Sequence, residues 1–156
     1  MASVSADLRI EEITEVREDL LAAMVRLVKQ LSQSAVPPGR AELEEIARSS
    51  ASRLLVARAD DGSILGTLTL ALFRIPTGMR AWIEDVVVDE TTRRRGVGEA
   101  LTAAALSMAH DAGARTVDLT SRPPREAANR LYRRLGFEPR ETTVYRFGSA
   151  ACRRGR

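Results

Sequence analysis

The residues with the clearest chemical signature lie directly after an apolar run that ends at Val88. Residues 89–98 read DETTRRRGVG and lead into a helical pattern. A helix N-terminus presents backbone N–H groups without partners inside the helix, together with about half a positive charge. Glycine lets a phosphate approach that backbone closely, and arginine adds complementary charge. The segment therefore predicts a site for a diphosphate or a 3′-phosphate.

Two common phosphate-binding patterns are absent from this turn. No Gly-Lys-Ser/Thr follows it, so it is not a Walker A loop. The third glycine and the acidic residue of the dinucleotide fingerprint are also missing. A purely structural interpretation remains open, in which the glycines meet the steric needs of a helix start and the arginines face solvent.

This turn needs a strand before it and a helix after it. The β-branched run at residues 81–88 predicts the strand, and the spacing of apolar residues in 98–111 predicts the helix. A further strand is expected at 117–120. The three elements then form a right-handed βαβ unit whose two strands are parallel.

The remaining elements follow from hydrophobic periodicity and turn residues. The order predicts a mixed α/β domain over residues 1–148 and a short basic tail over 149–156. The other expected strands are 7–14, 53–59, 64–73 and a last short pair ending near 143–147; the other expected helices are 17–33, 40–49 and 125–135.

Composition excludes several classes of protein. The net charge is only +3 and aromatic residues are 4%, which argues against a nucleic-acid partner. The longest uncharged apolar stretch, 64–73, is too short to span a bilayer, and no secretory signal is apparent at the start. The chain has one cysteine, Cys152, and one histidine, His110, too few for the usual His/Cys zinc site. We expect no metal, no membrane partner and a location in the bacterial cytoplasm.

Three motifs between residues 53 and 147 resemble the GCN5-related N-acetyltransferase (GNAT) superfamily. Arg93-x-x-Gly96-x-Gly98 matches the superfamily's Gln/Arg-x-x-Gly-x-Gly/Ala diphosphate loop. Residues 83–88 (IEDVVV) match its central strand, and residues 128–137 (ANRLYRRLGF) match its A-x-x-LY-x-x-x-GF signature. The resemblance implies a single GNAT-type domain. Its sheet would be mostly antiparallel with one splayed parallel pair, and helices would cover both faces.

The resemblance also implies acetyl-CoA as co-substrate, held where strands 81–88 and 117–120 separate. Backbone groups of Val86 and Val88, with Val87 between them, would meet the pantetheine arm and the acetyl carbonyl. Arg125 stands where the family often has an asparagine, and a contact with a CoA phosphate is a guess based on charge. Asn129 is a further candidate cofactor contact, but the resemblance does not give it the role of the family's asparagine. The amides expected to wrap the diphosphate, after the motif opens at Arg93, are those of Arg94, Arg95, Gly96, Val97, Gly98 and Glu99.

Acetyl transfer to an amine needs a base, a donor for the oxyanion and an acid for the leaving thiolate. Glu84 and Asp85 are neighbours on a strand, so strict alternation puts them on opposite faces. Alternation places Glu84 on the same face as the Val86 side chain, which favours Glu84 as the base, although Asp85 stays open. The alternative is that both are solvated carboxylates. The family resemblance implies Tyr132 as the acid, the alternative being a core residue with its hydroxyl at the rim.

The acceptor is expected to lie against residues 17–50 and the 74–80 turn, again by resemblance. The first of these regions is acidic and would suit a cationic amine, unless its carboxylates simply lie on helix surfaces. A polyamine, an aminoglycoside, an amino-acid derivative and a protein N-terminus or lysine all remain possible. So does a second class of function, a non-catalytic sensor that only binds acyl-CoA. The sequence leaves monomer and homodimer open.

Overall fold

The computed structural model describes residues 8–149, in two compact units divided after Ser121. Most of the expected tail, including Cys152, lies outside the described residues. The elements of the first unit are β1 (Leu8–Glu12), α1 (Glu18–Leu31), α2 (Arg40–Arg48), β2 (Ser52–Ala59), β3 (Ile64–Ile75), β4 (Gly78–Val88), the 3-10 helix η1 (Glu90–Thr92), α3 (Val97–Asp111) and β5 (Thr116–Asp118), and that of the second is α4 (Glu126–Arg134).

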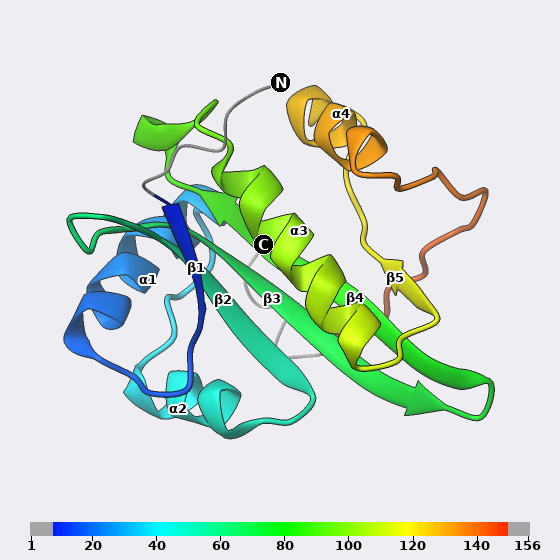
Figure 1. Ribbon diagram of the computed structural model, residues 1–156, viewed down its shortest axis with the longest axis horizontal. Helices are drawn as coiled ribbons and strands as arrows, with labels where there is room; N and C mark the ends of the chain where they lie inside the picture. Colours follow the sequence, from blue (N-terminus) through cyan, green and yellow to red (C-terminus); the bar gives the residue numbers. More distant parts are fainter. Residues whose placement is uncertain (1–7, 150–156) are drawn as a thin grey trace. The chain divides into compact units, whose positions relative to one another are not determined.

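The first unit is built on one five-stranded sheet in the order β1-β2-β3-β4-β5 (Figure 1). The first three pairings are antiparallel, and β4 pairs with β5 in parallel, which confirms the predicted βαβ unit. That parallel register covers only Arg80–Trp82 opposite Thr116–Asp118, although β4 runs on to Val88. The two strands therefore part after Trp82, and the expected strand 117–120 ends at Asp118.

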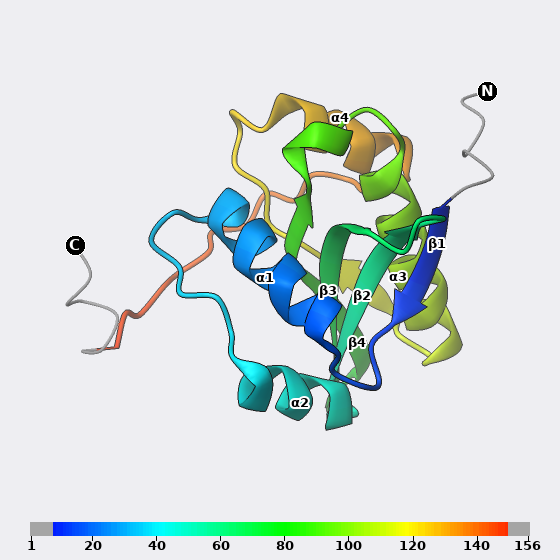
Figure 2. The same cartoon turned by 90° about the vertical axis from the view of Figure 1, so that its left-hand side faces the viewer.

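Helices cover both faces of this sheet (Figure 2). Leu20, Met24 and Leu27 recur at helical spacing along α1 and pack with Leu54 and Val56 of β2 in one buried cluster. Acidic residues in the first turn of α1 and a lysine in its last turn complement the helix dipole. The other face carries α3, which joins β4 to β5.

The start of α3 is seated against the sheet at Gly66 of β3. A Cβ on Gly66 would lie 2.8 Å from the Val87 carbonyl oxygen, 3.0 Å from Val97 Cγ1 and 3.3 Å from Leu101 Cδ1. Only glycine leaves room for this close approach. The contact fixes the first turn of α3 beside the last residues of β4.

The second unit begins at Arg122 and, in the described residues, consists of a short loop, α4 and the segment that follows it. The Tyr132 and Phe137 rings meet edge to face, with centroids 5.7 Å apart, and the Phe137 amide donates to the Tyr132 carbonyl at 3.0 Å. The expected strand pair ending near 143–147 is wrong, because residues 137–149 contain no strand. A strand of an ordered sheet buries one face. Here Val144, Tyr145 and Phe147 are 65%, 91% and 90% exposed.

Gly66→Ala should lower the free energy of unfolding by about 1–3 kcal/mol, the usual cost of overpacking a close contact. The added methyl group would meet a backbone oxygen that has no freedom to move aside. Urea denaturation of the variant and the wild type measures the difference. Gly148→Ala is the control, because a Cβ there meets nothing within 4 Å. Equal stability of all three proteins would contradict the packing described.

Candidate active site

A β-bulge in β4 sets the direction of the candidate base. Thr69 pairs with Glu84 and Thr67 pairs with Val87, with a register shift between these pairs. Asp85 sits in the shift and adopts a φ of 49°, a conformation that few residues other than glycine take up. Because Thr67 and Thr69 lie on one face of β3, Glu84 shares its face with Val87. The expectation that Glu84 lies with Val86, based on strict alternation, is therefore wrong.

Glu84 is held by a neighbour two residues earlier on the strand. The Trp82 indole donates from Nε1 to Glu84 Oε1 at 2.7 Å, so the two side chains lie on one face. Glu84 is exposed and Trp82 is half-buried. The carboxylate thus lies just beyond the residue where β4 and β5 part, with one oxygen fixed by the indole.

The connection from β4 to α3 is organised by one buried carboxylate. Asp89 is 6% exposed, and its amide donates to the Leu65 carbonyl at 2.7 Å. Its Oδ1 accepts from the Thr91 amide at 3.0 Å and from the Thr91 hydroxyl at 2.8 Å. Oδ2 accepts from Arg26 Nε of α1 at 2.7 Å. Burial alone would raise the pKa of Asp89, but the bonds from Thr91 and Arg26 outweigh it and hold the pKa below its ordinary value.

The chain enters α3 through two left-handed residues, Arg94 with a φ of 68° and Gly96 with a φ of 77°. Gly96 is the N-cap of α3, and its carbonyl accepts the Ala100 amide at 2.9 Å. A Cβ on Gly96 would meet nothing within 4 Å, so the space beside this cap is open.

The side chains around this cap are compatible with an anion. Arg93, Arg94 and Arg95 are exposed, whereas Val97 is 2% exposed and anchors the helix. Gly98 and Glu99, which complete the sequence-predicted loop, are half-buried in the first turn. A helix N-terminus with open space at its cap and three exposed arginines just before it is compatible with an anion in charge.

Val86, Val87 and Val88, the other sequence-predicted cofactor contacts, form the last residues of β4. Val87 is 8% exposed and packs in the core cluster under α1, while Val86 and Val88 are half-buried. The structure therefore places Glu84 and Val87 on the α1 face of β4, and the start of α3 follows the end of the same strand.

The second unit carries the other predicted site residues. Burial raises the pKa of the Tyr132 phenol, and the nearby Arg125 charge opposes that shift. Arg125 is exposed and is the N-cap of α4. Asn129 donates from Nδ2 to the Arg122 carbonyl at 3.1 Å, so its amide closes the loop before α4.

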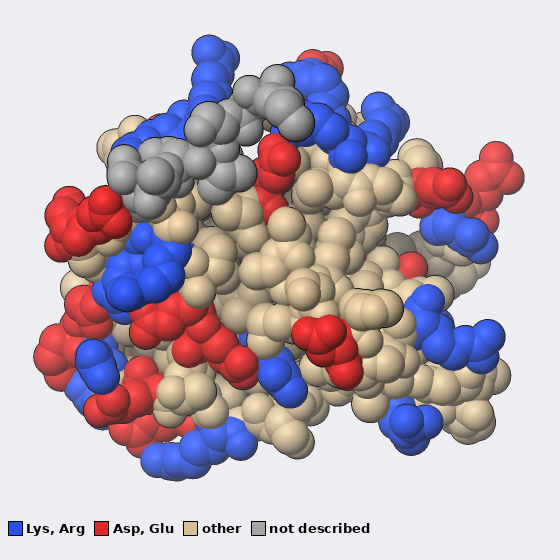
Figure 3. Space-filling view, viewed as in Figure 1, with Lys and Arg blue, Asp and Glu red and all other residues tan. Residues whose placement is uncertain are grey.

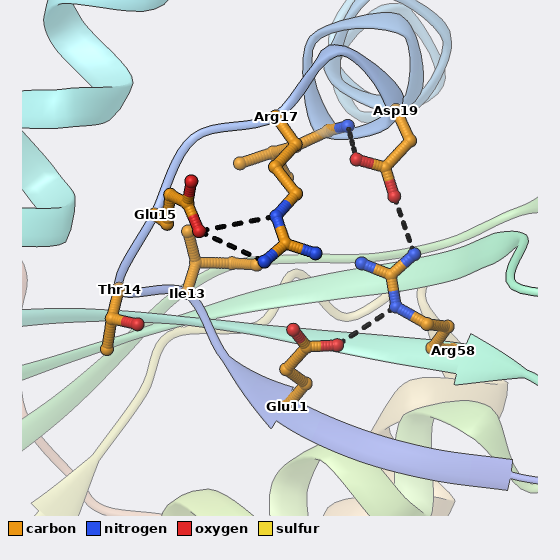
Figure 4. Close-up of a pocket in the computed structure, with 8 residues that line it drawn as sticks. Glu11, Ile13, Thr14, Glu15, Arg17, Asp19 and Arg58 are labelled. Atoms are coloured by element: carbon orange, nitrogen blue, oxygen red, sulfur yellow. Dashed lines mark hydrogen bonds and ion pairs between the residues drawn. The ribbon is translucent and has the colours of Figure 1, made fainter.

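The pocket drawn in Figure 4 is a different feature from the α3 N-terminus. It has a volume of about 60 Å³, and its lining residues are Glu11, Ile13, Thr14, Glu15, Arg17, Asp19, Leu20 and Arg58. Arg58 donates to Glu11 at 2.9 Å, to Asp19 at 2.6 Å and to the Gly62 carbonyl at 2.7 Å. These charges are paired with one another, so the pocket is a structural junction between β1, β2 and α1.

Ion pairs also account for many carboxylates of the acidic first third. Figure 3 shows acidic side chains gathered at the lower left, over the region of β1, α1 and α2, with basic side chains among them. This arrangement favours the interpretation that these carboxylates lie on element surfaces. The paired carboxylates are Glu11, Glu12, Glu15, Glu18, Asp19 and Glu44.

Two further findings concern the described residues. Between residues 8 and 149, no cluster of three or more His, Cys, Asp or Glu side chains is arranged to hold a metal ion. Over the same residues, no helix has the length and apolar character needed to cross a membrane.

The sequence analysis missed Arg26 and Gln30, which connect α1 to the site. Arg26 reaches Asp89, and Gln30 Oε1 accepts the Glu90 amide at 2.9 Å. Arg26 and Asp89 are 63 residues apart, and no local pattern links them. The Asp-x-Thr spacing of residues 89–91 is a recognisable side-chain-to-backbone turn and could have identified the cap.

Comparison with known proteins identifies the class of fold and then the family. Three solved structures share this architecture. An acetyltransferase from Trypanosoma brucei is 25% identical, with a TM-score of 0.73 over 90% of this chain and 99% of that chain. An aminoglycoside acetyltransferase from an uncultured soil metagenomic sample, in complex with trehalose, is 21% identical, with a TM-score of 0.77 over 94% of this chain and 99% of that chain; AAC(6′)-Iy, in complex with the bisubstrate analogue CoA-S-monomethyl-acetylneamine, is 22% identical, with a TM-score of 0.73 over 93% of this chain and 100% of that chain. No curated protein matches the chain. Residues 15–137 match the Acetyltransferase (GNAT) family, so the chain belongs to that family.

Asp89→Asn should destabilise the protein by about 1–3 kcal/mol at neutral pH, because it weakens charge-assisted hydrogen bonds in a buried site. A lowered pKa in the folded state contributes stability above the unfolded value of about 3.9, and this contribution is lost as the pH falls through the folded value. The difference between variant and wild type should therefore shrink below about pH 4. Urea denaturation at pH 7, 5 and 3.5 measures it, and a difference independent of pH would contradict the assignment.

Proposed function

We propose that this chain transfers the acetyl group of acetyl-CoA to a primary amine, on a small molecule or on a protein N-terminus or lysine. The observation that carries the proposal is the left-handed turn at Arg94 and Gly96, which opens α3 directly after a strand that has parted from its neighbour. Membership of the GNAT family and the complex of AAC(6′)-Iy with a CoA bisubstrate analogue support the choice of cofactor.

In this proposal the cofactor is bound by main-chain groups. The amides of residues 94–99 take the diphosphate, and Arg93 and its two neighbours add positive charge. The pantetheine arm follows the free edge of β4 at residues 86–88. Arg125 meets a phosphate of CoA from the start of α4. Asn129 supports that contact indirectly, because its amide holds the loop before α4.

The reaction is direct attack. The amine nitrogen forms a bond to the acetyl carbonyl carbon, and the carbonyl oxygen becomes an oxyanion that accepts a hydrogen bond from the Val86 amide. Glu84 takes the proton that the amine loses, directly or through one water molecule. The C–S bond then breaks, and the Tyr132 phenol donates its proton to the CoA thiolate. Trp82 keeps the Glu84 carboxylate turned toward the reacting amine through the bond to Oε1.

A thiol-release assay across a panel of amines tests this function. The panel holds a polyamine, an aminoglycoside, an amino-acid amide and a peptide with a free N-terminus. Amine-dependent release of CoA is the expected result. Tight binding of CoA without turnover on any amine would favour the non-catalytic acyl-CoA sensor instead.

Glu84→Gln should lower kcat/KM for the amine by about 100-fold or more, the usual contribution of a general base. The dissociation constant for CoA should stay unchanged, because the carboxylate does not bind the cofactor. Steady-state kinetics and calorimetry measure the two quantities. Asp85→Asn is the matched control, since asparagine also tolerates a positive φ. A large loss of kcat/KM for Asp85→Asn with none for Glu84→Gln would assign the role of base to Asp85 instead of Glu84.

Tyr132→Phe should lower kcat by about 100-fold with little change in CoA affinity, because a phenol that protonates the thiolate acts only in the reaction. The raised pKa keeps the phenol protonated beyond its ordinary value of about 10, so wild-type activity should show no loss from Tyr132 ionisation below pH 10. Stopped-flow kinetics from pH 6 to 10 measure the kcat of the variant and the pH dependence of wild-type activity. Unaltered kcat in the variant would remove Tyr132 from the mechanism.

A further inference from the structure

Arg26 of α1 ties together two strand ends that are distant in sequence. Its Nε donates to Asp89 Oδ2 at 2.7 Å, directly after β4, and its Nη2 donates to the Ile64 carbonyl at 2.7 Å, at the start of β3. A guanidinium has fixed planar geometry, so two such bonds define where the attached groups lie relative to α1. Arg26 therefore links one covering helix to the place where β4 leaves the sheet.

The Asp89 carboxylate connects Arg26 to the loop that follows β4. Oδ1 holds the amide and hydroxyl of Thr91, while Oδ2 holds Arg26, so both oxygens are engaged. Thr92 is 7% exposed, and its hydroxyl donates to the Asp89 carbonyl at 3.0 Å. The η1 turn is thus fixed from inside, and the next residues are the three arginines and the Gly96 cap.

Gln30 adds a second tie one helical turn further along α1. Its Oε1 accepts the Glu90 amide at 2.9 Å. Residues four apart lie on the same face of a helix. One face of α1 therefore holds the two successive residues that begin the connection, Asp89 by an ion pair and Glu90 by a hydrogen bond.

We propose that Arg26 is a positioning residue for the CoA diphosphate: its pairing with Asp89 presets the loop whose amides bind the anion. This inference rests on the proposed function. Amides that already point at the anion lose less freedom on binding, so a fixed loop binds more tightly than a mobile one. Arg26 also neutralises Asp89, whose charge would otherwise oppose the arrival of a diphosphate nearby.

Arg26→Gln should weaken CoA binding by about tenfold, because the loop must then be ordered when the anion binds. Arg26→Lys keeps the charge but lacks the planar pair of donors, so it should recover only part of the affinity. Gln30→Ala should weaken binding in the same direction but less. Calorimetry with CoA at a temperature well below the unfolding midpoint measures all three. The values of kcat/KM for acetyl-CoA and for S-acetylpantetheine, which lacks the diphosphate, are then compared. In Arg26→Gln the value for acetyl-CoA should fall far more than the value for S-acetylpantetheine.

Arg40→Gln is a matched control for general destabilisation. Arg40 also joins a carboxylate, Glu18, and a backbone carbonyl, that of Val16, and its side chain is 44% exposed against 46% for Arg26. It should lower the unfolding midpoint without changing CoA affinity. Equal CoA affinity in Arg26→Gln and wild type, equal weakening by the Arg26 and Arg40 variants, or an equal fall for both acetyl donors would each overturn the inference. If the wild type itself binds no CoA, the proposed function fails as well, and that result needs no variant.

Discussion

The structure depends on how the chain leaves β4 and turns into α3 through the open cap at Gly96. A buried carboxylate makes this possible, because Asp89 binds Thr91 on one side and Arg26 on the other while its own amide stays paired with Leu65. At the far end Gly96 takes a left-handed conformation, which costs other residues about 1–2 kcal/mol. The connection is therefore held at its start by Asp89 and at its end by the Gly96 cap, and our proposal is that this presets the amides between them for an anion.

The register shift in β4 also sets the direction of the candidate base, Glu84. The register shift around Asp85 places Glu84 and Val87 on one face, and the Trp82 indole then holds the carboxylate. Bulges often lie next to active sites, where the local bend of the strand redirects a side chain. Asp85 adopts an unfavourable positive φ as a result, which is the conformational cost of orienting Glu84 in this way. The splay from β5 begins in the same region, so the base candidate and the free strand edge adjoin each other.

Much of the fold could be predicted from the sequence because its signals are local. Residues 17–33 carry apolar side chains at helical spacing, and the observed helix spans Glu18–Leu31. The parallel pairing of β4 with β5 follows from the handedness of a strand–helix–strand crossover. The DETTRRRGVG segment likewise identified the α3 N-terminus, because glycine and arginine have local reasons to stand there.

Other features could not be predicted because they depend on distant or subtle contacts. The bulge at Asp85 has no glycine or proline to mark it, so alternation misplaced Glu84 relative to Val86. Arg26 and Asp89 meet only in the folded chain. The strands expected near 143–147 followed from residue type alone, but Tyr145 and Phe147 are exposed, and residues 137–149 form no strand.

The account is tested most directly by a crystal structure of the chain with CoA. It predicts the diphosphate oxygens within hydrogen-bond distance of the backbone amides of residues 94–99, with Gly96 still left-handed and Asp89 still paired with Arg26. A diphosphate bound elsewhere on the chain, or a loop closed over those amides by its own side chains, would contradict it.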